Sequence, residues 1–176
     1  MDCDFSCEEF NQYRIDLPYP EVTVDRPNHQ WARLVSGIYA GKGSETTAIA
    51  QYTAHRYYTA QYPAAFTAYK YITIVETIHL ELLGNLVLAL GFKPLFASFE
   101  TNRYWTGQYP DYQFDLRRII ESDIAGERGA IAHYQRLIGQ IPDESIQALF
   151  RRIILDEERH IEVLNWLYAT YVGPNG

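Results

Sequence analysis

The chain has 176 residues, of which 47% are hydrophobic and 21% charged, and its formal net charge is −7. These values fit one globular domain with a full core and exclude disordered, collagen-like and coiled-coil compositions. The acidic balance argues against a nucleic-acid partner, because proteins that bind duplexes present a basic face. No apolar run reaches the roughly 18 residues of a membrane span, and the start lacks a signal-peptide pattern. We therefore expect a cytoplasmic protein with no membrane partner.

Only two cysteines occur, Cys3 and Cys7, and both lie in the polar N-terminal tail. Two thiols at this spacing could chelate a metal or close a small loop. Because no second pair exists, the chain cannot build a zinc ribbon or a rubredoxin-type iron site. The sequence assigns these cysteines no role.

The first 28 residues differ in pattern from the stretch that follows them. Residues 1–28 contain three prolines and little hydrophobic periodicity, which predicts an extended N-terminal arm with a short strand at 21–24. Apolar residues then recur at three- and four-residue steps. This periodicity predicts a helix over 29–60, with a kink where Gly41 and Gly43 interrupt it.

Three more helices are predicted in the rest of the chain. Pro63 suits the first turn of a helix over about 64–90, which a glycine follows. Residues 91–114 are aromatic and polar and form a long connection. Two further helices are predicted over about 115–139 and 142–171, the second of which begins with a proline.

The lengths of the connections indicate how these helices pair. Short loops make the first and second helices antiparallel neighbours, and likewise the third and fourth. We therefore predict an all-α four-helix bundle of two helical hairpins joined by a long crossover. The domain division is an extended N-terminal arm at residues 1–28 and the bundle at residues 29–176.

Two motifs recur in the two hairpins at nearly the same offset. The pattern ExxAIAxY occurs at 45–52 and again 82 residues later, at 127–134. The pattern ExxH[LI]ExL occurs at 76–83 and again 81 residues later, at 157–164. The hairpins therefore look like an internal duplication. Each ExxH places a carboxylate and an imidazole on one face of a helix, about one turn apart.

The positions of these motifs bring four glutamates to one level of the bundle. At about 1.5 Å of rise per residue, each motif glutamate lies roughly 20–26 Å from the turn of its hairpin. Four buried carboxylates repel one another, and two divalent cations would balance their charge. One glutamate from each of two helices, with an ExxH from each of the other two, is the di-iron or di-manganese carboxylate arrangement. The competing interpretation is a chance alignment of glutamates on solvated faces.

The chain resembles the ferritin-like superfamily in these motifs. Residues 45–55, ExxAIxQYxxH, are similar to the first helix of bacterioferritins, and residues 156–161, DEExHI, are similar to their last. The stretches 19–28 and 39–45, YP…RPN and YAG…SE, are more similar to short manganese catalases and their spore-coat relatives. The resemblance covers about residues 19–172 and implies a ferritin-like four-helix bundle.

This resemblance implies a ligand set for two Fe or two Mn ions, made of four glutamates and two histidines: Glu45, Glu76, His79, Glu127, Glu157 and His160. Either Glu76 with Glu127 or Glu45 with Glu157 could bridge the two ions, and the sequence leaves this open. Glu121 is the rival of Glu127 on the third helix, and we prefer Glu127 because only it matches the repeat. Ligands of this type suit both metals.

Two aspartates are candidates for holding the histidines in place. A ligating imidazole usually donates its other N–H to a carboxylate. Asp156 precedes a motif glutamate, as in bacterioferritins, and we expect it to serve His79 across the bundle. Asp123 lies one turn before Glu127, and we expect it to serve His160.

Two tyrosines lie two turns past motif glutamates, where they could hydrogen-bond ligand carboxylates, pass electrons or act as core aromatics. These are Tyr52 and Tyr134. Glu81 and Glu162 also match in the repeat, but they lie about 140° around their helices and are expected in solvent or an interface. Three further histidines are expected to be ordinary: His29, His55 and His133.

The sequence leaves the activity open between several classes. We expect a dinuclear non-haem redox protein that reacts with H2O2 or O2, either manganese-catalase-like or peroxidase-like with an external electron donor. The first alternative is a ferroxidase and iron-storage protein of the bacterioferritin type. In that family a methionine holds haem, and Met1 is the one methionine here, so we expect no haem. The second alternative is a non-enzymatic structural or coat bundle in which the metal only stabilises the fold. The aromatic arm and crossover predict a homo-oligomer, most simply a dimer.

Overall fold

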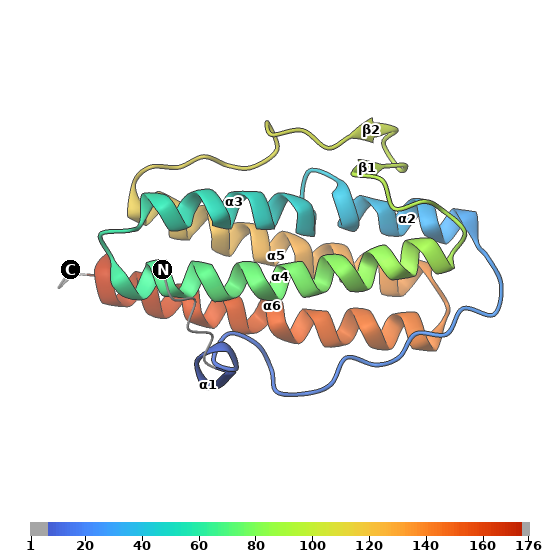
Figure 1. Cartoon of the computed structure of the whole chain (residues 1–176), viewed down its shortest axis with the longest axis horizontal. Helices are drawn as coiled ribbons and strands as arrows, with labels where there is room; N and C mark the ends of the chain where they lie inside the picture. The colour runs from blue at the N-terminus through green and yellow to red at the C-terminus, as the bar shows by residue number, and fades with distance from the viewer. Residues whose placement is uncertain (1–6, 174–176) are drawn as a thin grey trace.

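The computed structural model describes residues 7–173, and these form a bundle of long helices with very little sheet (Figure 1). A short helix, α1, begins the described part at Cys7, whereas Cys3 lies outside the described residues. The element bounds are α1 (Cys7–Phe10), α2 (His29–Ala40), α3 (Glu45–Tyr58), α4 (Pro63–Ala89), α5 (Leu116–Gln140) and α6 (Glu144–Tyr171). Helices α2 and α3 lie end to end along one side and together take the place of one long helix of the bundle. The predicted all-α four-helix architecture is therefore confirmed.

Polar N-caps begin most of these helices. The side chains of Asn28, Ser44, Asp115 and Asp143 each accept a hydrogen bond from a backbone N–H three residues further on. Each bond satisfies one of the free N–H groups of a first helical turn. Helix α4 begins instead at Pro63, which has no N–H to satisfy. The second, third and fourth predicted helices agree with the structure to within about two residues.

The first predicted helix is two helices rather than one kinked helix. Gly41 ends α2 in an extended conformation, and a Cβ at this position would overlap the carbonyl oxygen of Gly37. Ser44 then caps α3, accepting the N–H of Thr47 and donating its own hydroxyl to Gly41 O at 2.7 Å. The break makes Glu45 the first residue of α3 and leaves it buried in the bundle.

The N-terminal arm runs along α6 as an extended segment without the predicted strand, because residues 21–24 pair with no other strand. Side-chain donors on α6 hold it instead. The Arg152 guanidinium donates to the carbonyl oxygens of Ile15 and Leu17 at 2.6 to 3.0 Å, and Arg159 donates to Gln12 O at 2.8 Å. The arm therefore lies beside the helix that carries the second ExxH motif.

The crossover passes over α2 and α3 and contains the two described strands, β1 (Ala97–Ser98) and β2 (Arg103–Tyr104), which pair antiparallel (Figure 1). Phe99 N donates to the Ser36 hydroxyl on α2 at 2.8 Å. Trp105 Nε1 donates to the Thr47 hydroxyl on α3 at 3.0 Å. These bonds fix the crossover against the outer side of the bundle.

The hydrophobic core consists of two main parts, and the buried glutamates and histidines of the motifs lie between them on α3, α4, α5 and α6. One part surrounds α2 and includes Val35, Leu83, Leu86, Tyr134, Leu137 and Phe150. The other surrounds α3 and includes Tyr52, Ile72, Ile119, Ile120, Leu164 and Leu167. These buried glutamates and histidines therefore occupy a level with packed apolar layers on both sides, which shield them from water at both ends of the bundle.

Helix α4 is the most apolar of the long helices. Among the described residues it is the one helix with the length and composition to cross a membrane, with a mean hydropathy of 1.5 over an 18-residue window. Core helices of soluble proteins pass the same test. In the bundle α4 buries Glu76 and His79, so its inner face carries charge-bearing groups.

Candidate metal centre

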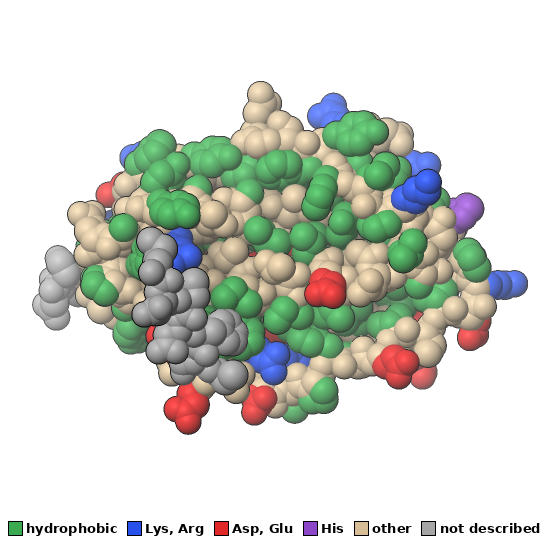
Figure 2. All heavy atoms as spheres, in the orientation of Figure 1, with side chains coloured by type: hydrophobic (Ala, Val, Ile, Leu, Met, Phe, Trp, Pro, Cys, Tyr) green, Lys and Arg blue, Asp and Glu red, His purple; other side chains and the backbone are tan. Residues whose placement is uncertain are grey.

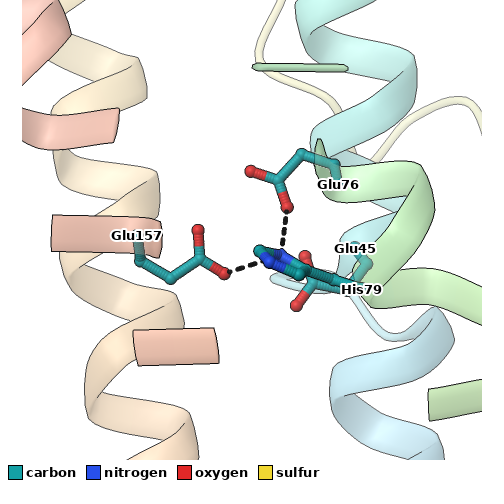
Figure 3. A group of neighbouring side chains, drawn as sticks. All are labelled: Glu45, Glu76, His79 and Glu157. Carbon is teal, nitrogen blue, oxygen red and sulfur yellow. Dashed lines mark hydrogen bonds and ion pairs between the residues drawn. The ribbon is translucent and has the colours of Figure 1, made fainter. Parts of the chain in front are cut away.

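The structure brings all six predicted ligands together at the middle of the bundle. They come from α3, α4, α5 and α6, and each is at least 98% buried. Ligand atoms of one quartet lie within 4.8 Å of one another, and so do those of a second quartet. The first quartet is Glu45, Glu76, His79 and Glu157, drawn in Figure 3, and the second is Glu76, Glu127, Glu157 and His160.

Two glutamates, Glu76 and Glu157, belong to both quartets. Each supplies the glutamate of an ExxH motif, and Figure 3 shows Glu157 facing Glu76 and His79 across the bundle. Glu45 and His79 belong to one quartet alone, and so do Glu127 and His160. The geometry therefore points to Glu76 and Glu157 as the pair placed to bridge two ions, which differs from either pair that the sequence suggested.

The oxygen and nitrogen atoms of the site converge in a way that fits cations. Nδ1 of His160 lies 3.0 Å from Glu76 Oε1, 3.1 Å from Glu157 Oε2 and 3.3 Å from Glu127 Oε1. A single N–H can satisfy only one of these oxygens. Nδ1 of His79 likewise faces Glu76 Oε2 at 3.2 Å and Glu157 Oε1 at 3.4 Å. Imidazole and carboxylate groups aimed at shared points from several helices form a donor set that suits Mn or Fe.

In the metal-free site, the pKa of each ligand group depends on burial and on the charges of the other ligands. Burial, together with the charges of Glu157 and Glu76, raises the pKa of Glu45 and of Glu127 well above the usual range. Burial opposes a charged imidazole, but the facing carboxylates outweigh it and raise the pKa of both His79 and His160. The metal-free site therefore keeps protons on groups that a cation would need as ligands.

Asp156 lies where the sequence predicts, beside His79. His79 Nε2 is 3.1 Å from Asp156 Oδ2, and the Arg152 guanidinium forms an ion pair with the same oxygen at 2.8 Å. The Tyr19 hydroxyl and the Ile15 N–H also donate to this carboxylate, each at 2.7 Å. Although burial acts to raise the pKa of Asp156, the hydrogen bond and charge of His79 lower it, with help from Tyr19 and Ile15. Asp156 is thus held as an anion that orients the ring of His79.

The prediction that Asp123 serves His160 is wrong. Asp123 accepts hydrogen bonds from Tyr69 at 2.6 Å and Gln51 at 2.7 Å, and it lies 2.9 Å from His55 Nδ1. Asp123 lies one turn before Glu127 on α5, next to the part of the core around α3. There it contacts His55 of α3 and not His160. Within residues 7–173, Nε2 of His160 has no hydrogen-bond partner.

The two predicted tyrosines both donate to ligand carboxylates, each across the bundle. The hydroxyl of Tyr52 donates to Glu127 Oε1 at 2.7 Å, and the hydroxyl of Tyr134 donates to Glu45 Oε1. Tyr52 and Glu45 lie on α3, whereas Tyr134 and Glu127 lie on α5. Each tyrosine therefore bonds to the glutamate of the other repeat. Burial and the neighbouring carboxylates raise the pKa of both phenols well above the usual value, which keeps them protonated as donors.

The remaining candidates lie away from the ligands. Glu121 is exposed and contacts Tyr168 and Arg117, so Glu127 is the glutamate of α5 that reaches the site. Glu81 and Glu162 are exposed, as the helical angle predicts. None of the three other histidines belongs to either quartet: His29 packs on Phe92, His133 lies beside Arg136, and His55 pairs with Asp123.

Three residues that no sequence motif pointed to hold Asp156 from outside the site: Arg152, Tyr19 and Ile15. Arg152 lies four residues before Asp156 on α6, a spacing at which opposite charges meet on a helix surface. That signal was visible in the sequence. Tyr19 and Ile15 lie more than 130 positions away along the chain, and no local pattern connects them to Asp156.

Comparisons with known proteins identify the fold. No protein-family profile matches the chain. No curated protein matches it either. Among solved structures, KatB, a manganese catalase from Anabaena, superposes with a TM-score of 0.79 at 23% identity, covering 88% of this chain and 78% of that one. A bacterioferritin from Rhodobacter capsulatus, with a metal-free dinuclear site and haem iron, gives a TM-score of 0.67 at 23% identity, covering 86% of this chain and 92% of that one. The chain therefore has the ferritin-like fold, as its motifs suggested.

Proposed function

We propose that the protein is a dinuclear Mn or Fe redox protein that reacts with H2O2 or O2, of the manganese-catalase or peroxidase class. The observation that carries this proposal is the pair of buried quartets that share Glu76 and Glu157. Four carboxylates and two imidazoles match two divalent cations in charge and in donor type. When bound, such a metal pair supplies two-electron redox chemistry for peroxide or O2.

The chain's own residues have three tasks in this proposal. Glu76 and Glu157 would hold both ions, while Glu45 with His79 and Glu127 with His160 would each hold one of them. Asp156 orients His79, and the Tyr52 and Tyr134 hydroxyls fix the carboxylates of Glu127 and Glu45. The apolar layers on both sides exclude bulk water from this level of the bundle.

The fold comparison supports two of the candidate activities. Similarity to a manganese catalase favours disproportionation of H2O2 into water and O2. Similarity to a bacterioferritin favours the alternative, oxidation of Fe(II) followed by storage. An external electron donor would turn the same site into a peroxidase.

One set of measurements separates these activities. The metal content of natively expressed protein is determined first, and O2 release after addition of H2O2 is then followed with an oxygen electrode. Vigorous O2 release by manganese-loaded protein supports a catalase, whereas donor-dependent loss of peroxide without O2 supports a peroxidase. Uptake of Fe(II) into a large particle supports storage. A loaded protein whose absorption spectrum responds to neither H2O2 nor O2 would contradict the redox proposal and leave a structural metal staple.

We also propose that the protein forms a homo-oligomer, most simply a dimer. Several large hydrophobic side chains of the crossover are exposed: Leu95, Phe96, Tyr104, Tyr112 and Phe114. Figure 2 shows hydrophobic groups along the upper part of the face drawn, where the crossover runs. Exposed apolar groups of this density favour a protein interface. Light scattering at micromolar concentration tests the proposal, and a clean monomer would contradict it.

A further inference from the structure

A narrow cavity connects the surface of the bundle with two of the six ligands. It has a volume of about 100 Å³ and lies between the start of α3 and the middle of α5. Exposed residues at its outer end include Lys42, Gly43 and Gly126, and its inner end is formed by Glu45 and Glu127. Residues 42–44, which lie in the break between α2 and α3, form part of its lining.

The solvent exposure of the ligands agrees with access to the site through this cavity between α3 and α5. Glu45 and Glu127 each keep 2% exposure, whereas the other four ligands are 0% exposed. The two ligands with any exposure are thus the two that line the cavity. Solvent-sized molecules therefore meet the site from the side of α3 and α5.

A second, wider cavity continues the first toward bulk solvent. Its volume is about 370 Å³, and it shares Gly43 and Gly126 with the narrow cavity. Its other lining residues on α5 are mostly small, among them Gly129 and Ala132. The two cavities share Gly43 and Gly126 as lining residues, so they adjoin at these two glycines and together lead from solvent to the carboxylates of Glu45 and Glu127.

We propose that this opening is the path by which small oxidants reach the metal site, and that the absence of a side chain at Gly126 keeps it open. A Cβ at Gly126 would meet no heavy atom within 4 Å, so a larger side chain there would project into the shared space rather than into the packed core. Between Lys42 and the two carboxylates the lining is uncharged, with hydrogen-bonding groups such as Ser44 and Gln51. Such a lining suits small neutral molecules like H2O2 and O2. This proposal rests on the dinuclear function proposed above.

The test compares Gly126→Leu with Gly139→Leu. Both glycines lie exposed on α5, and a Cβ atom at either position would have open space around it, but Gly139 lines neither cavity. The first readout is water-proton relaxation by manganese-loaded protein, which reports the exchange of water at the metal and needs no turnover. Gly126→Leu is expected to lower the relaxation toward the metal-free value, whereas Gly126→Ala, whose Cβ has open space around it, and Gly139→Leu are expected to match the wild type.

The second readout is reaction with peroxides of different size. Gly126→Leu is expected to lower kcat/KM for H2O2 about tenfold, equivalent to about 1.4 kcal/mol of barrier, with unchanged metal content. The wild type is expected to discriminate against tert-butyl hydroperoxide. If loaded Gly126→Leu keeps wild-type relaxation, the path is wrong although the site stands. If the wild type binds no manganese or iron, both the path and the proposed function are overturned.

Discussion

Nε2 of His79 lies 3.1 Å from the Asp156 carboxylate, which also accepts a hydrogen bond from Tyr19 in the N-terminal arm. The orientation of one candidate ligand is therefore connected to a segment that the sequence places outside the bundle. His160, its counterpart in the repeat, has no hydrogen-bond partner at Nε2 in the part of the chain that the structure describes. The two halves of the duplicated site thus differ in what surrounds their histidines.

This difference predicts that Asp156→Asn weakens the binding of one ion more than the binding of the other. Loss of such a carboxylate partner lowers metal affinity about 10–100-fold, and Asp156 contacts His79 but not His160. Competitive chelation should resolve one weakened site and one unchanged site. Tyr19→Phe, which leaves the contact between Asp156 and His79 intact, is expected to have a smaller effect. An equal loss at both sites would contradict the asymmetry.

The shared glutamates predict a pattern in metal stoichiometry. Glu76→Gln or Glu157→Gln should impair binding of both ions, because each glutamate belongs to both quartets. Glu45→Gln should impair one ion only. Glu158→Gln is the matched control, since Glu158 is the exposed neighbour of Glu157 on α6. Elemental analysis after gel filtration measures the outcome, and a Glu76→Gln protein that keeps both ions would exclude its bridging position.

The shifted pKa values predict that metal affinity rises with pH. In the metal-free protein the pKa is raised at Glu45, Glu127, His79 and His160, so these groups hold protons that a cation must displace. Raising the pH removes this competition, and lowering it strengthens it. Calorimetry in buffers of different ionisation enthalpy should therefore show proton release on binding of Mn(II). Affinity that is independent of pH between 5 and 8 would disagree with protonated ligands.

Metal removal is expected to lower thermal stability. Binding to the native state alone stabilises it, by about 2.7 kcal/mol when free metal is at 100 times Kd. Chelated protein should therefore melt below the loaded form in calorimetric scans, and returning Mn(II) should restore the higher temperature. Equal melting temperatures after verified metal removal would count against a native metal site.

The buried pair of His55 and Asp123 is predicted to act on stability rather than on metal binding. Both side chains are fully buried, and Asp123 also receives hydrogen bonds from Gln51 and Tyr69. His55→Gln replaces one partner of Asp123 in this buried contact and is expected to cost about 1–3 kcal/mol of unfolding free energy. Urea denaturation measures that loss, while metal stoichiometry should stay at the wild-type value. A loss of bound metal without a loss of stability would assign His55 to the site instead.

The sequence by itself determined the last three long helices, how the helices pair and the level at which six polar residues meet, although it joined α2 and α3 into one kinked helix. These features depend on helical periodicity, loop length and the rise per residue, which are local and nearly rigid. The repeat of ExxAIAxY and ExxH[LI]ExL therefore sufficed to place Glu45, Glu76, Glu127 and Glu157 at one height. It also distinguished Glu127 from the exposed Glu121.

Only the tertiary structure decided which of these residues face one another. Whether Asp123 meets His160 or His55 depends on how α3, α5 and α6 rotate about their axes, and a sequence pattern contains no information about that rotation. The same holds for the shared position of Glu76 and Glu157. The contact of Tyr19 with Asp156 joins residues 137 positions apart, and the cavity beside Glu45 is lined both by residues 42–44 after α2 and by Gly126 of α5. Such contacts arise from packing between distant segments, which local propensity does not encode.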